Sequence, residues 1–167
     1  MKTPAPNLAQ QPPASPRERL AGFAVARRTI DKCRADAAGT RGDYHYDCPL
    51  DNQLFSFKGI EGDLFREAVR RAETVEDVGV WLLSNGTPRT QAEIAAWSAQ
   101  VEAQRPYDDP QMREWFVKAC QPLGLDPQRA TLFDMLEADD RASFAKPSGA
   151  GPATKDRQGR VELIFNS

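Results

Sequence analysis

The hydrophobic pattern of this chain has the period of a helix. Apolar residues recur three or four positions apart through most of the sequence, the spacing that places them on one side of an α-helix. The first such segment spans residues 17–39, where Leu20, Ile30 and Cys33 belong to the apolar side and Gly39 supplies a C-terminal stop. We therefore predict an amphipathic first helix over these residues.

Capping signals predict where the later helices begin. In such a signal a side chain forms hydrogen bonds with the free backbone groups of the first helical turn. Four such signals stand before apolar stripes: Thr74 with Asp77, Thr90 with Glu93, Asp109-Pro110 and Asp126-Pro127. Two short helices are predicted ahead of them, over residues 51–57 and 62–72. Short connections favour antiparallel neighbours, so the pattern predicts one all-α domain of about six or seven helices.

The two ends of the chain have a different composition. Residues 1–16 contain five prolines among small polar residues and should be extended, either flexible or laid along the domain. Residues 141–167 are rich in Lys, Pro, Gly and Ser, and their apolar run at 161–165 could form a short strand. The predicted organisation is a Pro-rich arm over 1–16, a helical domain over 17–140 and a flexible tail.

Composition and charge narrow the class of protein. Of the 167 residues, 40% are hydrophobic and 28% are charged, which is typical of a globular chain. The formal net charge of -2 gives no overall attraction to nucleic acid or anionic lipid. No apolar run reaches the roughly 20 residues of a membrane span, and residues 1–11 lack a signal-peptide core. We expect a cytoplasmic protein with neither a membrane nor a nucleic acid as partner.

The cysteines argue against a disulfide framework and a metal site. Cys33, Cys48 and Cys120 are odd in number and widely spaced, and no C-x-x-C pair occurs. A zinc centre needs three or four ligands, whereas the nearest local approach, His45 with Cys48, supplies two. We predict free thiols, no metal and no cofactor.

Four stretches carry a resemblance to a known family: residues 12–17 with Leu20, residues 30–35, residues 44–51 and residues 92–97. The third, which reads Tyr-His-Tyr-Asp-Cys-Pro-Leu-Asp, is the most distinctive. On these residues the chain resembles the bacterial family called domain of unknown function 5069. The resemblance implies a small, mainly helical cytosolic protein whose proline arm belongs to the domain, and it implies no activity, substrate or cofactor.

The segment 44–48 holds the sharpest candidate for chemistry. His45 stands three residues before Cys48, and an imidazole close to a thiol can lower the pKa of that thiol and activate it as a nucleophile. Tyr44 and Asp47 are candidate ligand-binding residues in the same segment. The alternative is a structural loop, because cysteine is often buried and tyrosine rings pack while their hydroxyls form hydrogen bonds. We prefer the structural interpretation.

A basic face on the first predicted helix is the second candidate. Lys32 and Arg34 could bind a phosphate or an acidic partner surface, together with Arg27, Arg28 and Arg41. The alternative, which we prefer, is a face that is solvated or neutralised inside the molecule. The carboxylates proposed to neutralise it lie near the other end of the domain: Asp134, Glu137, Asp139 and Asp140.

No complete set of catalytic groups appears in the chain, and the tryptophans Trp81, Trp97 and Trp115 fall on apolar stripes where they should be core anchors. We therefore expect a non-enzymatic interaction or regulatory module with a protein partner. The alternative is a small-ligand binder or an enzyme that uses the segment 44–48. The sequence leaves open whether the protein is an enzyme and what its oligomeric state is.

Overall fold

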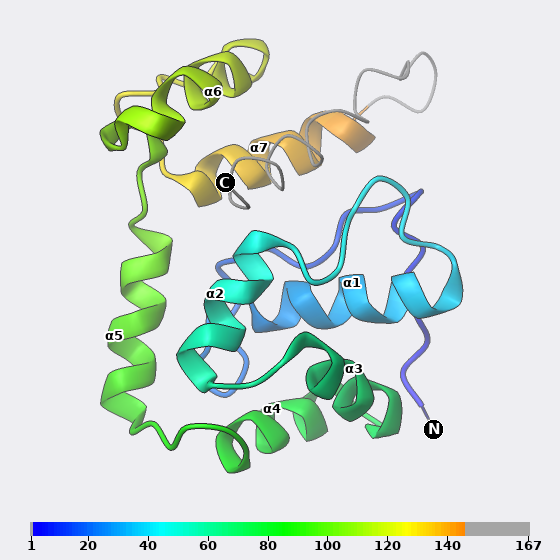
Figure 1. The fold of residues 1–167 in the computed structure, drawn as a ribbon. Helices are drawn as coiled ribbons and strands as arrows, with labels where there is room; N and C mark the ends of the chain where they lie inside the picture. Colours follow the sequence, from blue (N-terminus) through cyan, green and yellow to red (C-terminus); the bar gives the residue numbers. More distant parts are fainter. Residues whose placement is uncertain (1, 146–167) are drawn as a thin grey trace.

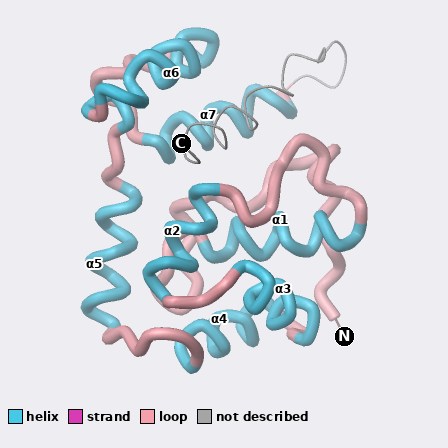
Figure 2. Tube along the Cα trace, viewed as in Figure 1, coloured by secondary structure: helices cyan, strands magenta, loops and turns pink. Residues whose placement is uncertain are grey.

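The computed structural model describes residues 2–145 and confirms the all-α prediction for them, since they form seven α-helices and no β-strand (Figures 1 and 2). The helices are α1 (Ala26–Ala38), α2 (Pro49–Lys58), α3 (Gly62–Arg71), α4 (Val75–Ser84), α5 (Gln91–Glu102), α6 (Pro110–Cys120) and α7 (Leu132–Phe144). Two 3-10 turns, Pro106–Asp108 and Gln121–Leu123, flank α6. The candidate strand at 161–165 lies outside the described residues.

Helix α1 lies at the centre, and nine of its thirteen residues are buried. One apolar cluster joins it to α2, α3 and α4 around Ile30, Leu54 and Phe65. A second cluster joins the start of α2 to α6 and α7 around Phe116 and Phe133. Helix α5 contributes to both clusters and runs along the side of the molecule between them (Figure 1). A helix surrounded in this way buries its polar residues along with its apolar ones.

The first helix begins later than predicted, at Ala26 instead of residue 17. Ala21 and Val25 have positive φ angles of 52° and 73°, which no helix allows. Ser98 of α5 holds this segment, because its Oγ accepts from Ala24 N at 2.9 Å and donates to Gly22 O at 3.0 Å. A side chain remote in sequence therefore supplies the partners that helical hydrogen bonds would otherwise provide.

The start predicted for the last helix is also wrong. The backbone carbonyl of Asp126 accepts from the amides of Arg129 and Ala130, which makes a turn. Helix α7 begins after Thr131, whose Oγ1 accepts from Asp134 N at 3.1 Å while Thr131 N donates to Asp134 Oδ2 at 2.9 Å. A capping box with both reciprocal bonds satisfies two backbone donors, whereas an Asp-Pro pair satisfies fewer. The starts predicted for α4, α5 and α6 are confirmed.

The Pro-rich arm, of which residues 2–16 are described, lies along the domain. Leu8 is only 1% exposed, and its amide donates to Thr40 O at 2.8 Å. Ala14 N donates to Asp31 Oδ2 at 2.9 Å, so the arm is hydrogen-bonded directly to the central helix. These contacts favour the second of the two arrangements expected for the arm.

Candidate functional site

Cys48 is the N-cap residue of α2, with Pro49 at the first helical position. Asp51 Oδ2 accepts hydrogen bonds from the backbone amides of Asp47 at 3.0 Å and Cys48 at 3.3 Å. Proline lacks the amide that would be unsatisfied at the first position, and a carboxylate in the first turn favours the helix start. The distinctive Asp-Cys-Pro-Leu-Asp run is thus a helix start in its own right.

The thiol of Cys48 belongs to a buried ionic cluster. Lys32 Nζ lies 3.0 Å from Asp51 Oδ2 and 3.1 Å from Cys48 Sγ, and all three side chains are buried. The Thr29 hydroxyl lies 2.8 Å from Asp51 Oδ1 and occupies the other oxygen of that carboxylate. Burial alone would lower the pKa of Lys32, but the nearby Asp51 and Cys48 raise it, so the ammonium stays charged.

The pKa of the Cys48 thiol is raised. Burial is the main cause and the Asp51 carboxylate adds to it, while Lys32 acts in the opposite direction. A histidine-activated nucleophile requires a shift downward, towards the thiolate. At neutral pH this thiol is protonated and serves as a weak acceptor for the ammonium of Lys32.

The imidazole of His45 is half-buried and has a guanidinium as partner, since His45 Nδ1 lies 2.9 Å from Arg41 Nη1. Arginine only donates, so Nδ1 is the acceptor and a neutral ring carries its proton on Nε2. Arg41 also donates to Tyr44 O at 2.9 Å and so ties the ring to the backbone of the loop. Cys48 thus contacts the ammonium of Lys32, whereas His45 contacts the guanidinium of Arg41.

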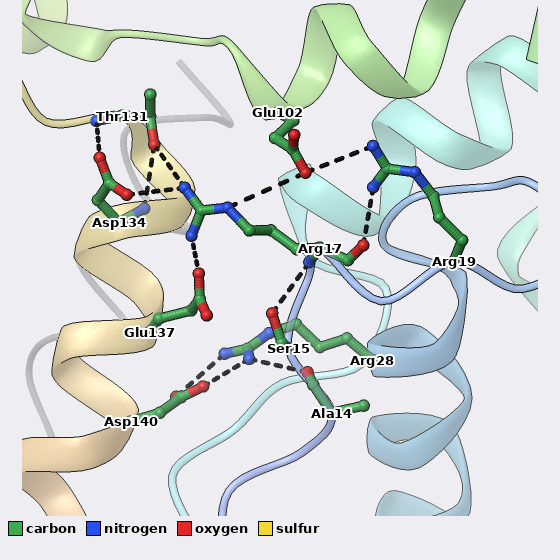
Figure 3. Close-up of polar contacts among 10 residues, drawn as sticks. All are labelled: Ala14, Ser15, Arg17, Arg19, Arg28, Glu102, Thr131, Asp134, Glu137 and Asp140. Carbon is green, nitrogen blue, oxygen red and sulfur yellow. Dashed lines mark hydrogen bonds and ion pairs between the residues drawn. The ribbon is translucent and has the colours of Figure 1, made fainter. Parts of the chain in front are cut away.

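Tyr44 belongs to a second buried cluster. Its hydroxyl donates to Asp140 Oδ1 at 2.7 Å. Asp140 in turn forms two contacts with Arg28, of 2.7 and 3.2 Å (Figure 3). Arg28 Nη1 also donates to Ala14 O at 3.3 Å. Burial would lower the pKa of Arg28, but Asp140 raises it. Burial is likewise the main cause of the raised pKa of Tyr44.

Asp47, the remaining candidate of the segment 44–48, is exposed and has a φ of 64°. Asn52 Nδ2 donates to its Oδ1 at 3.0 Å. A Cβ placed on Gly62 would lie 2.6 Å from Asp47 Oδ2, so the loop packs closely against the start of α3. Tyr46 strengthens this contact, because its hydroxyl donates to Gly62 O at 2.5 Å.

The basic groups are largely paired inside the molecule. Asp140 neutralises Arg28, whereas Asp134 and Glu137 instead pair with Arg17, the residue that follows the arm (Figure 3). Arg17 Nη2 lies 2.7 Å from Asp134 Oδ1. Neither Arg17 nor Asp51 was singled out as a charge partner from the sequence, because each seemed to belong to local structure at the start of a helix.

Arg34 differs from the other basic residues of α1. It lies two positions after Lys32, which on a helix of 3.6 residues per turn places it on the opposite side from the Cys48 cluster. It is 8% exposed, and its Nη2 is buried without a hydrogen-bond partner among the described residues. Burial is the main cause of its lowered pKa. The structure therefore separates Arg34 from Lys32, Cys48 and the other candidates of the loop.

Two further properties follow from the described part of the chain. Within residues 2–145, no three His, Cys, Asp or Glu side chains are grouped so that they could hold a metal ion. No helix in this range combines the length and the apolar character needed to cross a bilayer.

Cys33, Cys48 and Cys120 are all buried, and all three are free thiols in the structure.

Comparison with known proteins agrees with the resemblance carried by the sequence. A family model described as Domain of unknown function (DUF5069) matches residues 10–142. The matched range includes the central helix, the segment 44–48 and nearly all of α7, so both buried ionic clusters lie within it. No curated protein was found to match the chain.

Proposed function

Because the chain belongs to the family described as Domain of unknown function (DUF5069), which carries no assigned activity, we propose its function from the site itself. The protein is a non-enzymatic interaction or regulatory module of the cytoplasm, and another protein is its partner. The observation that carries this proposal is the state of Cys48, a buried thiol that accepts a hydrogen bond from Lys32 and has a raised pKa.

A thiol enzyme needs a thiolate that a substrate can reach. An ammonium 3.1 Å from the sulfur would help to form one, but Asp51 binds the same ammonium at 3.0 Å and offsets its charge. Cys48 is also the N-cap residue of a helix whose first turn contacts α1 through Asp51. These features support a structural role for the segment 44–48.

The other buried charges support the same interpretation. Arg28 with Asp140 joins α1 to α7, and Lys32 with Asp51 joins α1 to α2. Each of these four charged groups has a partner of opposite sign, an arrangement that fixes the relative position of the helices. Buried free thiols are typical of reducing compartments, which supports the cytoplasmic part of the proposal.

Exposed apolar side chains on α3 and α4 support a protein partner. Leu64, Val80 and Leu83 are 51%, 63% and 42% exposed, and Val80 and Leu83 lie one turn apart on the same side of α4. Clusters of such side chains are more common at interfaces than elsewhere on a surface. The double variant Val80→Ser with Leu83→Ser should lose a partner that the wild type retains in a pull-down.

The matched control for that experiment is Val117→Ser, which removes an apolar side chain of α6 that is 38% exposed. The control should retain the partner. Equal capture by all three chains, or capture by none, would contradict the proposed surface.

The non-enzymatic part of the proposal is tested by the rate at which iodoacetamide labels Cys48, followed by peptide mass spectrometry from mildly acidic to alkaline pH. We expect slow labelling of the native protein, an unchanged rate in His45→Ala, and fast labelling after denaturation in urea. Fast labelling below neutral pH that collapses in His45→Ala would overturn the proposal and favour the alternative, an enzyme or a small-ligand binder that uses the segment 44–48.

A further inference from the structure

A cavity of about 340 Å³ lies between α1, α3 and the start of the N-terminal arm. Four of its lining residues are cationic: Lys2, Arg34, Arg66 and Arg70. The other lining residues include no Asp or Glu, and most are apolar, Ala37 and Val69 among them. A cavity with this lining combines an excess of positive charge with an apolar wall.

Arg34 lines this cavity, and one of its guanidinium nitrogens lacks a hydrogen-bond partner in the described part of the chain. Its side chain is more than nine-tenths buried, yet Nη2 has no hydrogen-bond partner within residues 2–145. Asp31 of the same helix raises the pKa of Arg34 but forms no hydrogen bond with its Nη2, since it accepts from Ala14 N at 2.9 Å and lies 3.7 Å from Arg27 Nε. A buried guanidinium without its full set of acceptors destabilises a fold, whereas a ligand that supplies them removes that penalty.

The remaining cations of the cavity are held in place by the protein. Arg66 Nη1 donates to Asp36 Oδ2 at 2.9 Å, and Arg70 is paired with Glu67 at 2.6 Å. Lys2 Nζ donates to the carbonyl of Arg70, and this hydrogen bond holds the arm against the end of α3. Thr3 N donates to Glu73 O at 3.0 Å and makes a second contact between the arm and the residues that follow α3. The cavity walls are therefore positioned before any ligand arrives.

We propose that this cavity binds a small organic anion, a carboxylate on a short apolar body, with the carboxylate at Arg34 and the body against Ala37 and Val69. A planar guanidinium fits a carboxylate through two parallel hydrogen bonds. A free inorganic anion would leave the apolar wall uncovered, and a neutral apolar molecule would leave Arg34 unsatisfied. The volume is that of a site for a small molecule. This inference goes beyond the interaction module and stands independently of its protein partner.

The direct test is isothermal titration calorimetry of the full chain with hexanoate and with benzoate, compared with inorganic phosphate and with 1-hexanol. We expect the two carboxylates to bind more tightly than either comparison compound. Arg34→Met keeps the length of the side chain and should weaken carboxylate binding roughly 10-fold or more, because a charge-assisted hydrogen bond is lost. The melting temperature of this variant without ligand should be equal to or above that of the wild type.

Two further variants locate the site. Arg113→Met removes an exposed guanidinium from α6, outside this cavity, and should leave the affinity unchanged. Ala37→Trp fills the cavity from an exposed helix position while keeping all four cations, and it should abolish binding even if Arg34→Met fails to fold. The proposal is overturned if Ala37→Trp binds as the wild type does, or if phosphate or 1-hexanol binds as tightly as hexanoate. It is equally overturned if the wild type binds neither carboxylate at concentrations up to about 10 mM.

Discussion

Arg28 of α1 and Asp140 of α7 form a two-contact ion pair in the interior, with N···O distances of 2.7 and 3.2 Å. The two residues are 112 positions apart in the chain. Their side chains are 2% and 7% exposed, so neither charge has water as an alternative partner. The pair therefore makes the position of the last helix depend on the central one.

Removing one partner of this pair should be more damaging than removing both. Asp140→Ala leaves Arg28 buried without its carboxylate and should lower the free energy of unfolding by about 3–5 kcal/mol. The double variant Arg28→Met with Asp140→Leu leaves no buried charge and should lose less than the sum of the single losses. Urea unfolding of the wild type, the single variants Arg28→Met and Asp140→Leu and the double variant measures the coupling. Additive losses would show that the pair is not coupled in this way.

Ser98→Ala tests the link between α5 and the segment that precedes α1. The hydroxyl serves both Ala24 N, which is buried, and Gly22 O, which is half-buried, so its loss removes a partner from each and should cost about 1–3 kcal/mol. Ser84→Ala is the matched control, because that hydroxyl is exposed and only bonds one turn back to Val80 O. Equal unfolding free energies for the two variants would refute the assigned role of Ser98.

Leu8→Ala tests whether the arm is part of the domain. Leu8 is 1% exposed and packs with Ala35 and Tyr44, so we expect a loss of about 2–5 kcal/mol in unfolding free energy. Gln10→Ala changes an exposed residue of the same arm and should stay within about 0.5 kcal/mol of the wild type. An arm that merely rests on the surface would give two similar, small values in thermal or urea unfolding.

Alkaline pH should destabilise the protein through Cys33. Burial, the main cause, raises the pKa of this thiol to about 12 from its ordinary value of 9.0. Between these values the unfolded chain loses a proton that the folded one keeps, so stability falls with rising pH, at most by about 1.4 kcal/mol per pH unit. Below pH 9 this thiol contributes no pH dependence, because both states are protonated.

The measurement is urea unfolding in a reducing buffer from neutral pH to about pH 10.5, for the wild type and for Cys33→Ala. The variant should show a shallower decline above pH 9, whatever its stability at neutral pH. Cys120→Ala is a graded control, since burial raises the pKa of Cys120 only to about 11. Parallel curves for the wild type and Cys33→Ala would exclude Cys33 as a source of the alkaline loss.

Helices whose start signals are local could be predicted from the sequence. Thr74 and Thr90 cap α4 and α5 as their spacing indicates, because both bonds of a capping box join residues three positions apart. The start of α1 could not be predicted, since it depends on Ser98, more than seventy positions away. The start of α7 was predicted at Asp126, but the chain forms only a turn there and the helix begins at the capping box of Thr131, five residues later. The sequence does not show which of these two signals starts the helix.

In the candidate site, too, some contacts could be predicted from the sequence and others depend on the packing of distant residues. That carboxylates near the end of the domain would neutralise basic groups could be inferred from charge balance, and Asp140 does so for Arg28. The partner of Lys32 could not be inferred, because its contact with Asp51 depends on how α1 packs against α2 and no pattern in the sequence shows that packing. The predicted basic face joined Arg34 to Lys32, whereas the two residues lie on opposite sides of α1 because they are two positions apart on a helix.

The ion pair between Arg28 and Asp140 has a consequence for the order of events during biosynthesis. A ribosome delivers Arg28 early and Asp140 only near the end of the described chain, so a nascent chain that stops before α7 carries a guanidinium with no carboxylate to receive it. The apolar cluster that α7 completes is also open until then. Such a chain can form the cluster around Ile30 but not the one around Phe133, so we expect the domain to complete its folding only after α7 has been translated.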